Sequence, residues 1–70
     1  MAESNVSLLE QIACAERELR LRCSTYPKWV QQGRMDDDVA QKEISRMREI
    51  VNTLRRVFAE TVQPKLFDEQ

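Results

Sequence analysis

The sequence predicts an all-α protein, an antiparallel hairpin of two helices that dimerises into a four-helix bundle. The chain has 70 residues, a single glycine and one third charged residues, with Ala, Leu, Arg, Glu, Gln and Met recurring throughout, a mixture that favours helix. Apolar residues recur every three or four positions on both sides of one break. Because a chain this short buries only about 60% of its unfolded surface, we expect a homo-oligomer of two or more copies.

The first helix is predicted to span about residues 4–25. Ser4 or Asn5 is expected to cap it. Pro27 disfavours helical geometry at Tyr26, so we expect the helix to stop or kink there. Its apolar stripe consists of Leu8, Leu9, Ile12, Ala15, Leu19, Cys23 and Tyr26.

A structured linker turn is predicted over residues 26–35. Pro27 suits the first position of a new turn, and Gly33 suits a left-handed residue that ends one. The residues between them fit a short helical turn.

The second helix is predicted to span about residues 36–63. Asp36, Asp37 and Asp38 supply a cap and first-turn carboxylates that offset the helix dipole. Its apolar residues cover a wider part of the helix surface than one neighbouring helix can bury, which predicts a C2 dimer. These residues are Val39, Ala40, Ile44, Met47, Ile50, Val51, Leu54, Val57, Phe58 and Val62. Residues 1–63 then form one domain, and 64–70 a flexible tail.

Charge and cysteine content predict a cytoplasmic protein. The formal net charge is −1, so duplex nucleic acid and anionic membranes are not expected partners. Cys14 and Cys23 fall on opposite sides of one helix, which excludes a disulfide between them and indicates reduced thiols. No signal peptide or membrane-spanning run is recognisable.

Catalysis is not expected. The chain contains no histidine, and no Ser or Cys has the usual base beside it. Asp36, Asp37 and Asp38 stand where a helix needs caps, so we interpret them as capping residues rather than a Mg²⁺ site. No metal or other cofactor is predicted.

Aromatic and cationic residues gather around the break. Such a group can stack on a base and grip phosphate. Alternatively, the two rings close the open end of a small core and the cations are solvated. The group consists of Arg20, Arg22, Tyr26, Lys28, Trp29 and Arg34.

Two glutamates fall on the apolar stripes, Glu16 in the first helix and Glu43 in the second. Each needs a partner, because an unpaired buried charge is costly. They can lie at the stripe edges and pair with Arg20 or Arg46 at helical spacing. Alternatively, Glu43 accepts hydrogen bonds from the linking segment or meets a ligand there.

The tail contains "QPKLF", residues 63–67, which resembles the short peptide with which bacterial proteins dock on the replicative sliding clamp. Gln63, Leu66 and Phe67 match that pattern, whereas Pro64 and Lys65 depart from it. Docking would require an exposed tail. The alternative is that Leu66 and Phe67 fold back on the bundle.

Residues 18–54 contain a spaced set of residues, namely Glu18, Leu19, Arg22, Tyr26, Pro27, Trp29, Val30, Gly33, Ala40, Glu43, Ile44, Met47 and Ile50. With this set the segment resembles a group of short proteins of tailed phages and prophages. The resemblance implies a phage accessory protein in a bacterial cytosol and leaves its activity open. Small helical phage proteins commonly block a host protein or sequester the nucleotide signals of antiphage immunity.

Two hypotheses follow. In the first, a non-enzymatic homo-oligomer sequesters a nucleotide immune signal, which stacks on the two rings while cations hold its phosphates and Glu43 reads a base edge. The expected binding residues are Arg22, Tyr26, Lys28, Trp29, Arg34 and Glu43. In the second, the aromatic patch or a helix face binds and blocks a host protein, with the clamp as one variant.

Overall fold

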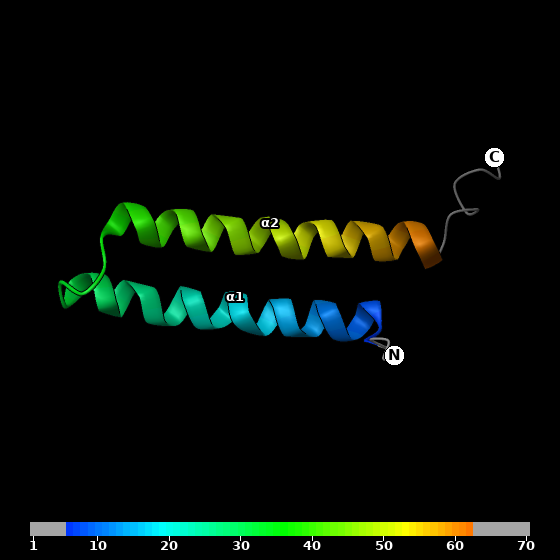
Figure 1. Ribbon diagram of the computed structural model, residues 1–70, viewed down its shortest axis with the longest axis horizontal. Helices are drawn as coiled ribbons and strands as arrows, with labels where there is room; N and C mark the ends of the chain where they lie inside the picture. Colours follow the sequence, from blue (N-terminus) through cyan, green and yellow to red (C-terminus); the bar gives the residue numbers. More distant parts are fainter. Residues whose placement is uncertain (1–5, 63–70) are drawn as a thin grey trace, which may run out of the picture.

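The computed structural model describes residues 6–62 and shows two antiparallel helices lying side by side, joined at one end by a short connection (Figure 1). Helix α1 spans Leu8–Gln31 and α2 spans Asp37–Val62. The predicted all-α hairpin is confirmed. Because the connection is short, the start of α1 and the end of α2 lie together at the opposite end of the hairpin.

Helix α1 begins with a capping box. The Ser7 hydroxyl accepts a hydrogen bond from the Glu10 amide at 3.1 Å, and the Ser7 amide donates to the Glu10 carboxylate at 3.0 Å. This reciprocal pair satisfies two backbone donors that the first turn leaves without helical partners. The cap is therefore Ser7, not Ser4 or Asn5 as predicted, and α1 begins at Leu8 rather than near residue 4.

Pro27 lies inside α1, so the predicted helix boundary near residue 25 and the separate linker turn over residues 26–35 are wrong. Proline removes one backbone donor and crowds the preceding turn, which costs about 3 kcal/mol in a helix interior. The apolar stripe nevertheless continues through Tyr26 to Val30, and both side chains are half-buried. Burial on this stripe offsets the local cost, and the residues expected to form a separate turn instead extend α1.

The connection, residues 32–36, starts with a Schellman motif. The Arg34 amide donates to the Trp29 carbonyl at 2.8 Å, and the Gly33 amide donates to the Val30 carbonyl at 3.0 Å. Gly33 has φ of +75°, a left-handed conformation that residues with a side chain rarely adopt. The predicted role of Gly33 as the residue that ends a turn is confirmed.

Helix α2 begins at the aspartate run, as predicted. The Ala40 amide donates to the Asp36 carbonyl at 3.0 Å, and Asp37 and Asp38 occupy the first turn. Their carboxylates lie near the positive end of the helix dipole and stabilise it.

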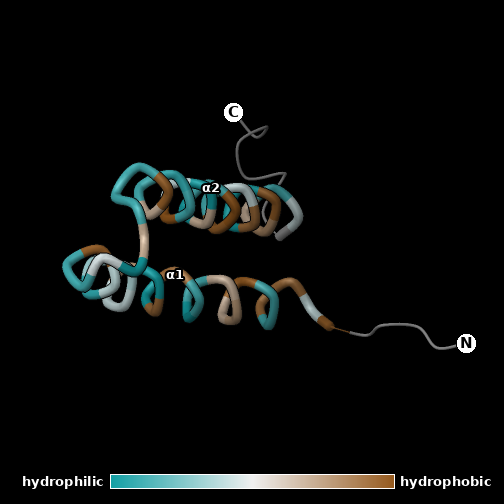
Figure 2. The backbone as a smooth tube through the Cα atoms, turned by 60° about the vertical axis from the view of Figure 1, so that its left-hand side comes forward, coloured by the Kyte–Doolittle hydropathy of each residue, from teal (hydrophilic) through white to brown (hydrophobic). Residues whose placement is uncertain are grey.

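The core is a thin seam between the helices. Ala15, Met47 and Val51 form its centre, and Leu19 and Leu54 pack against them. Figure 2 shows the recurring hydrophobic residues along both helices. Within residues 6–62, no large side chain is fully buried. Neither helix of this part combines the length and the apolar character that a membrane span requires.

Candidate functional site

An aromatic pair lies near the turn end of the hairpin. Tyr26 and Trp29 are one helical turn apart on α1, and their rings stack with centroids 5.6 Å apart and planes inclined by 23°. The Arg22 guanidinium lies 6.0 Å from the centre of the Tyr26 ring, and that of Arg34 lies 5.5 Å from the Trp29 ring. These distances suit cation–π attraction. We call these four residues the aromatic–cation cluster.

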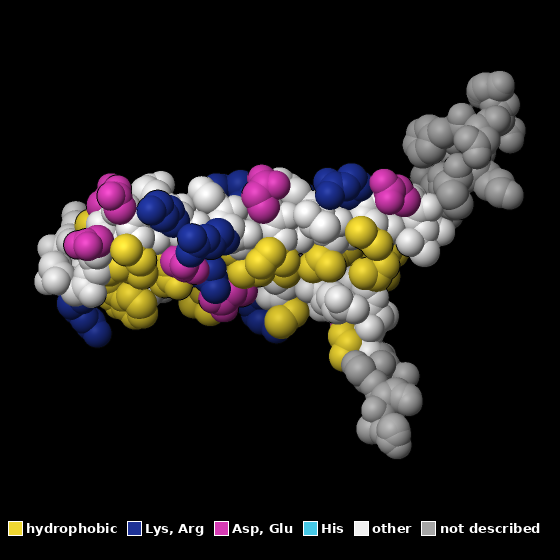
Figure 3. All heavy atoms as spheres, turned by 45° about the horizontal axis from the view of Figure 1, so that its top comes forward, with side chains coloured by type: hydrophobic (Ala, Val, Ile, Leu, Met, Phe, Trp, Pro, Cys, Tyr) yellow, Lys and Arg dark blue, Asp and Glu magenta, His cyan; other side chains and the backbone are white. Residues whose placement is uncertain are grey.

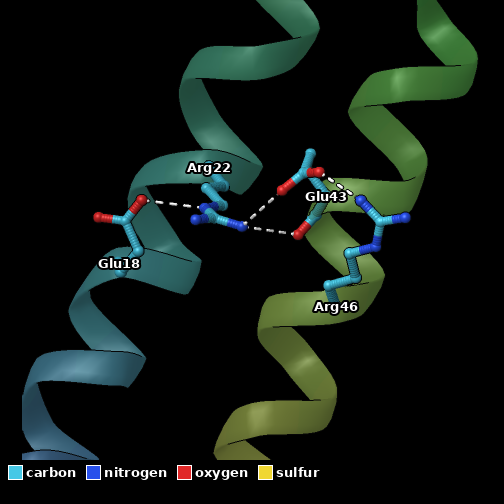
Figure 4. Close-up of polar contacts among 4 residues, drawn as sticks. All are labelled: Glu18, Arg22, Glu43 and Arg46. Carbon is cyan, nitrogen blue, oxygen red and sulfur yellow. Dashed lines mark hydrogen bonds and ion pairs between the residues drawn. The ribbon is translucent and has the colours of Figure 1, made fainter.

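A row of charged side chains joins the two helices (Figure 4). Arg22 donates from Nε to the Glu18 carboxylate at 2.9 Å and from Nη1 to the Glu43 backbone carbonyl at 2.9 Å. Its Nη1 also lies 3.4 Å from the Glu43 carboxylate, which accepts a 2.6 Å hydrogen bond from Arg46. Charge therefore alternates from Glu18 through Arg22 and Glu43 to Arg46. We call these four residues the charged row.

The charged row holds Arg22 in its ionised form. The hydrogen bond to the Glu18 carboxylate raises the pKa of Arg22, burial acts in the opposite direction, and the negative charges of Glu18 and Glu43 raise the pKa further. The guanidinium is thus a permanent cation whose Nε and Nη1 donors are engaged with protein groups. A ligand would have to compete with Glu18 and Glu43 for these two nitrogens.

Glu43 has the helical partner that one prediction gave it, Arg46. The other prediction, hydrogen bonds from the linking segment, is not what residues 6–62 show, because the second partner is Arg22 of α1. Glu16 pairs across the hairpin with Arg55 of α2 rather than with Arg20 as predicted. Both differences arise from contacts between the helices.

The structure brings only part of the predicted binding set together. Arg22, Tyr26, Trp29 and Arg34 form the aromatic–cation cluster, and Glu43 reaches it through Arg22. Lys28 is exposed in the last turn of α1, one residue and therefore about 100° from Trp29 around the helix. Of the other predicted cations, Arg20 lines a groove on another side of the hairpin, together with Glu16, Arg48, Asn52 and Arg55.

The surface beside the aromatic pair is only slightly hollowed. A hollow of about 140 Å³ is lined by Glu18, Leu21, Arg22, Thr25, Tyr26 and Trp29. Pockets for small organic ligands are usually about 300–1,000 Å³. A single hairpin therefore provides a stacked aromatic surface rather than an enclosed nucleotide pocket.

Helix α2 has exposed apolar residues along one side. Val39, Ile50 and Val57 are separated by 11 and 7 residues, spacings that return to nearly the same side of a helix. All three are exposed, Ile50 by 49%. Isolated exposed apolar residues are common, whereas these three are aligned and form an apolar strip along one side of α2.

Helix α1 continues this apolar surface. A groove between the helices is lined mainly by apolar atoms, with Val6 from the segment before α1, Cys14 from α1 and Leu54 from α2. Leu21, which is 53% exposed, lies in the hollow beside the charged row. Figure 3 shows a side of the hairpin where charged groups interrupt hydrophobic ones. We define the apolar face by Val6, Cys14, Leu21, Val39, Ile50, Leu54 and Val57.

Cys14 and Cys23 are free and exposed. Cys23 was predicted to belong to the apolar stripe of the first helix, so its exposure differs from that prediction. Within residues 6–62, no group of three or more His, Cys, Asp or Glu residues could hold a metal ion. The clamp-like residues Gln63, Leu66 and Phe67 lie outside the described residues.

Two ion pairs were not predicted from the sequence. Glu18 pairs with Arg22 in the charged row, and Arg55 pairs with Glu16 across the hairpin. The spacing of Glu18 and Arg22, four residues along α1, is a signal that could have identified the first pair. No protein-family model, curated protein or solved structure matches the chain.

Proposed function

We propose that the protein is a non-enzymatic binding protein that dimerises into a four-helix bundle and blocks a host protein through its aromatic–cation cluster. The observation that carries this proposal is the stack of Tyr26 on Trp29, with a guanidinium beside each ring. Aromatic and arginine side chains dominate binding hot spots. Because these rings are already ordered, little conformational entropy is lost when a partner binds.

The thin core and the apolar face support dimerisation. The buried residues of a single hairpin amount to Ile12, Ala15, Ala40, Met47 and Val51 among those described. Two helices packed through so small a seam gain little from apolar burial. A second hairpin placed on the apolar face would bury the exposed side chains and complete a bundle.

Sequestration of a nucleotide immune signal is the second candidate function. Arg34 supports it, because this residue lies over the Trp29 ring and its side chain is otherwise held by an exposed hydrogen bond of 3.2 Å to Gln32. A nucleobase could replace the guanidinium on the ring, and Arg34 with Lys28 could then hold phosphate. We rank this function second because Arg22 and Glu43 are engaged with each other and the hollow is small.

The proposed setting is the cytoplasm of a bacterium infected by a tailed phage, where the protein acts against host defence. This setting rests on the resemblance of residues 18–54 to small phage proteins. Docking on the sliding clamp through Gln63, Leu66 and Phe67 is a minor variant of the same proposal. It would use residues outside the aromatic–cation cluster and would survive substitution of Trp29.

Affinity capture from infected cells tests the proposal. The tagged protein is expected to retain one host protein in stoichiometric amount, and Trp29→Ala is expected to lose it. Gln31→Ala, a truncation of an exposed residue in the same helical turn, serves as the matched control and is expected to retain it. A nucleobase released on denaturation of wild type but not of Trp29→Ala would instead support sequestration. Capture that is equal for all three proteins would overturn both functions of the aromatic–cation cluster, and equal capture of the sliding clamp would support docking through the tail instead.

A further inference from the structure

We infer that a second copy of the chain covers the apolar face by a two-fold rotation about the long axis of the hairpin, which places both aromatic–cation clusters at the same end of the dimer. The inference rests on the dimer of the proposed function and deepens it, because each copy then contributes to one composite binding end.

The apolar face requires a partner with a particular pattern. Its hydrophobic residues are divided by the charged row, in which Arg46 and Glu18 are the more exposed ends and Arg22 and Glu43 the less exposed centre. A purely apolar partner would remove water from these charged groups and offer no hydrogen bonds in its place, and such desolvation costs free energy. The partner must therefore present charges of its own at this level, flanked by apolar residues.

A second copy meets that requirement in one of two orientations. Rotation about the long axis reverses the order of the row, so that Glu18 faces the partner subunit's Arg46 and Arg22 faces the partner subunit's Glu43. Opposite charges then meet at every position of the row. Because α1 also faces the partner subunit's α2, each helix has antiparallel neighbours, as in up-and-down four-helix bundles.

The other orientation brings like charges together. Rotation about an axis that runs across the hairpin keeps the order of the row, so that Glu18 faces the partner subunit's Glu18 and Arg46 faces the partner subunit's Arg46. Like charges placed directly opposite each other disfavour association and suppress the wrong arrangement. The alternating order seen in Figure 4 thus selects the first orientation.

The selected orientation has a consequence for binding. Rotation about the long axis leaves every residue at its own level, so both turns and both Tyr26–Trp29 stacks come to one end of the bundle. Two such stacks, each with Arg34 beside the Trp29 ring, form a wider surface than the hollow of a single hairpin, while Arg22 remains engaged in the charged row. One partner molecule can then contact both subunits.

Distances between spin labels in the full-length chain test the orientation. A label on Gln31→Cys marks the turn end of α1, and a label on Arg20→Cys marks its middle; Cys14→Ala and Cys23→Ala remove the native thiols from both variants. With turns together, two labels at position 31 are expected about 15–25 Å apart, since the two α1 helices lie diagonally across a bundle whose neighbouring axes are about 10 Å apart. With turns opposed, they would be about 35–45 Å apart, because the 24 residues of α1 span about 36 Å.

The label at position 20 is the matched control, because it lies near the middle of α1 and gives similar distances in both orientations. A short distance at both positions supports the inference. A short distance at position 20 with a long one at position 31 overturns the orientation and leaves the proposed dimer standing. No dipolar coupling at either position means that no second copy covers the face, which overturns the dimer as well. Capture through Trp29 is measured separately and does not depend on these outcomes.

Discussion

Arg22 joins the two helices by donating from Nη1 to the backbone carbonyl of Glu43 at 2.9 Å and by approaching the Glu43 carboxylate at 3.4 Å. A carbonyl inside a helix already accepts its own helical hydrogen bond, so Arg22 uses the second lone pair of that oxygen. The side chain is 22% exposed. Partial shielding from water makes this contact stronger than a surface ion pair.

The first prediction concerns Arg22→Met. The substitution keeps much of the aliphatic stem but removes the donors to Glu43 and Glu18, and hydrogen bonds to charged groups contribute about 1.5–3 kcal/mol. Because the site is partly solvated, we expect the free energy of unfolding to fall by about 1–2 kcal/mol. Urea unfolding followed by circular dichroism at one protein concentration measures it. Arg17→Met, at an exposed position of α1, is the control and should shift the free energy by at most about 0.5 kcal/mol. Equal losses in the two variants would show that Arg22 is an ordinary surface residue.

The second prediction concerns Gly33→Ala. Gly33 has φ of +75°, and an added Cβ would meet no atom within 4 Å, so the cost is conformational rather than steric. Left-handed geometry costs a residue with a side chain about 1–2 kcal/mol, and the free energy of unfolding should fall by that amount. Asparagine tolerates this conformation better than alanine, so Gly33→Asn is expected to lose less. A larger loss for asparagine than for alanine would contradict this explanation.

Local signals predicted the parts of the fold that depend on a few neighbouring residues. Gly33 ends the first helix in a left-handed conformation, and the aspartate run starts the second, because both effects act within one helical turn. Pro27 was misinterpreted for the same reason. Its local preference opposes helix, but the half-buried stripe that continues to Val30 outweighs it, and that burial depends on the hairpin as a whole.

Part of the candidate site was predictable from helical spacing. Tyr26 and Trp29 are three residues apart, so one continuous helix stacks them, whereas the predicted break at Pro27 hid this relationship. The cross-helix pairs Arg22–Glu43 and Glu16–Arg55 depend on how far one helix is shifted along the other. Hydrophobic periodicity identifies the facing stripes but not that shift, so it did not reveal these partners.

The third prediction concerns Ile50→Glu on the apolar face. Burial of a side chain of this size contributes about 1.5–3 kcal/mol, and each 1.4 kcal/mol is tenfold in affinity. Loss of that burial and the added carboxylate should weaken dimerisation at least about tenfold. Sedimentation over a range of concentrations measures the dissociation constant.

The matched control for Ile50→Glu is Asn52→Glu. Asn52 is exposed on the same helix but lines the groove that contains Glu16, Arg20, Arg48 and Arg55. A carboxylate there meets cations and should leave the dimerisation constant unchanged. If the Asn52 variant weakened association as much as the Ile50 variant, the groove rather than the apolar face would be the interface.

The fourth prediction uses the two native cysteines. Both are free and exposed in the hairpin, but Cys14 lies in the apolar groove with Val6 and Leu54, whereas Cys23 lies on the opposite side of α1. A second copy on the apolar face would cover Cys14 and leave Cys23 accessible. Cys23 is therefore expected to react with a maleimide at least about tenfold faster than Cys14, which requires only about 1.4 kcal/mol of protection.

Dilution supplies the control for this comparison, because dissociation exposes the apolar face without changing the sequence. The two thiols should approach equal rates when the protein is diluted below its dimerisation constant, and also in the Ile50→Glu variant. Labelling of each cysteine is measured by mass spectrometry of peptides after timed quenching. Equal rates at high protein concentration would mean that Cys14 stays open to solvent, and the dimer would then have to form through another face.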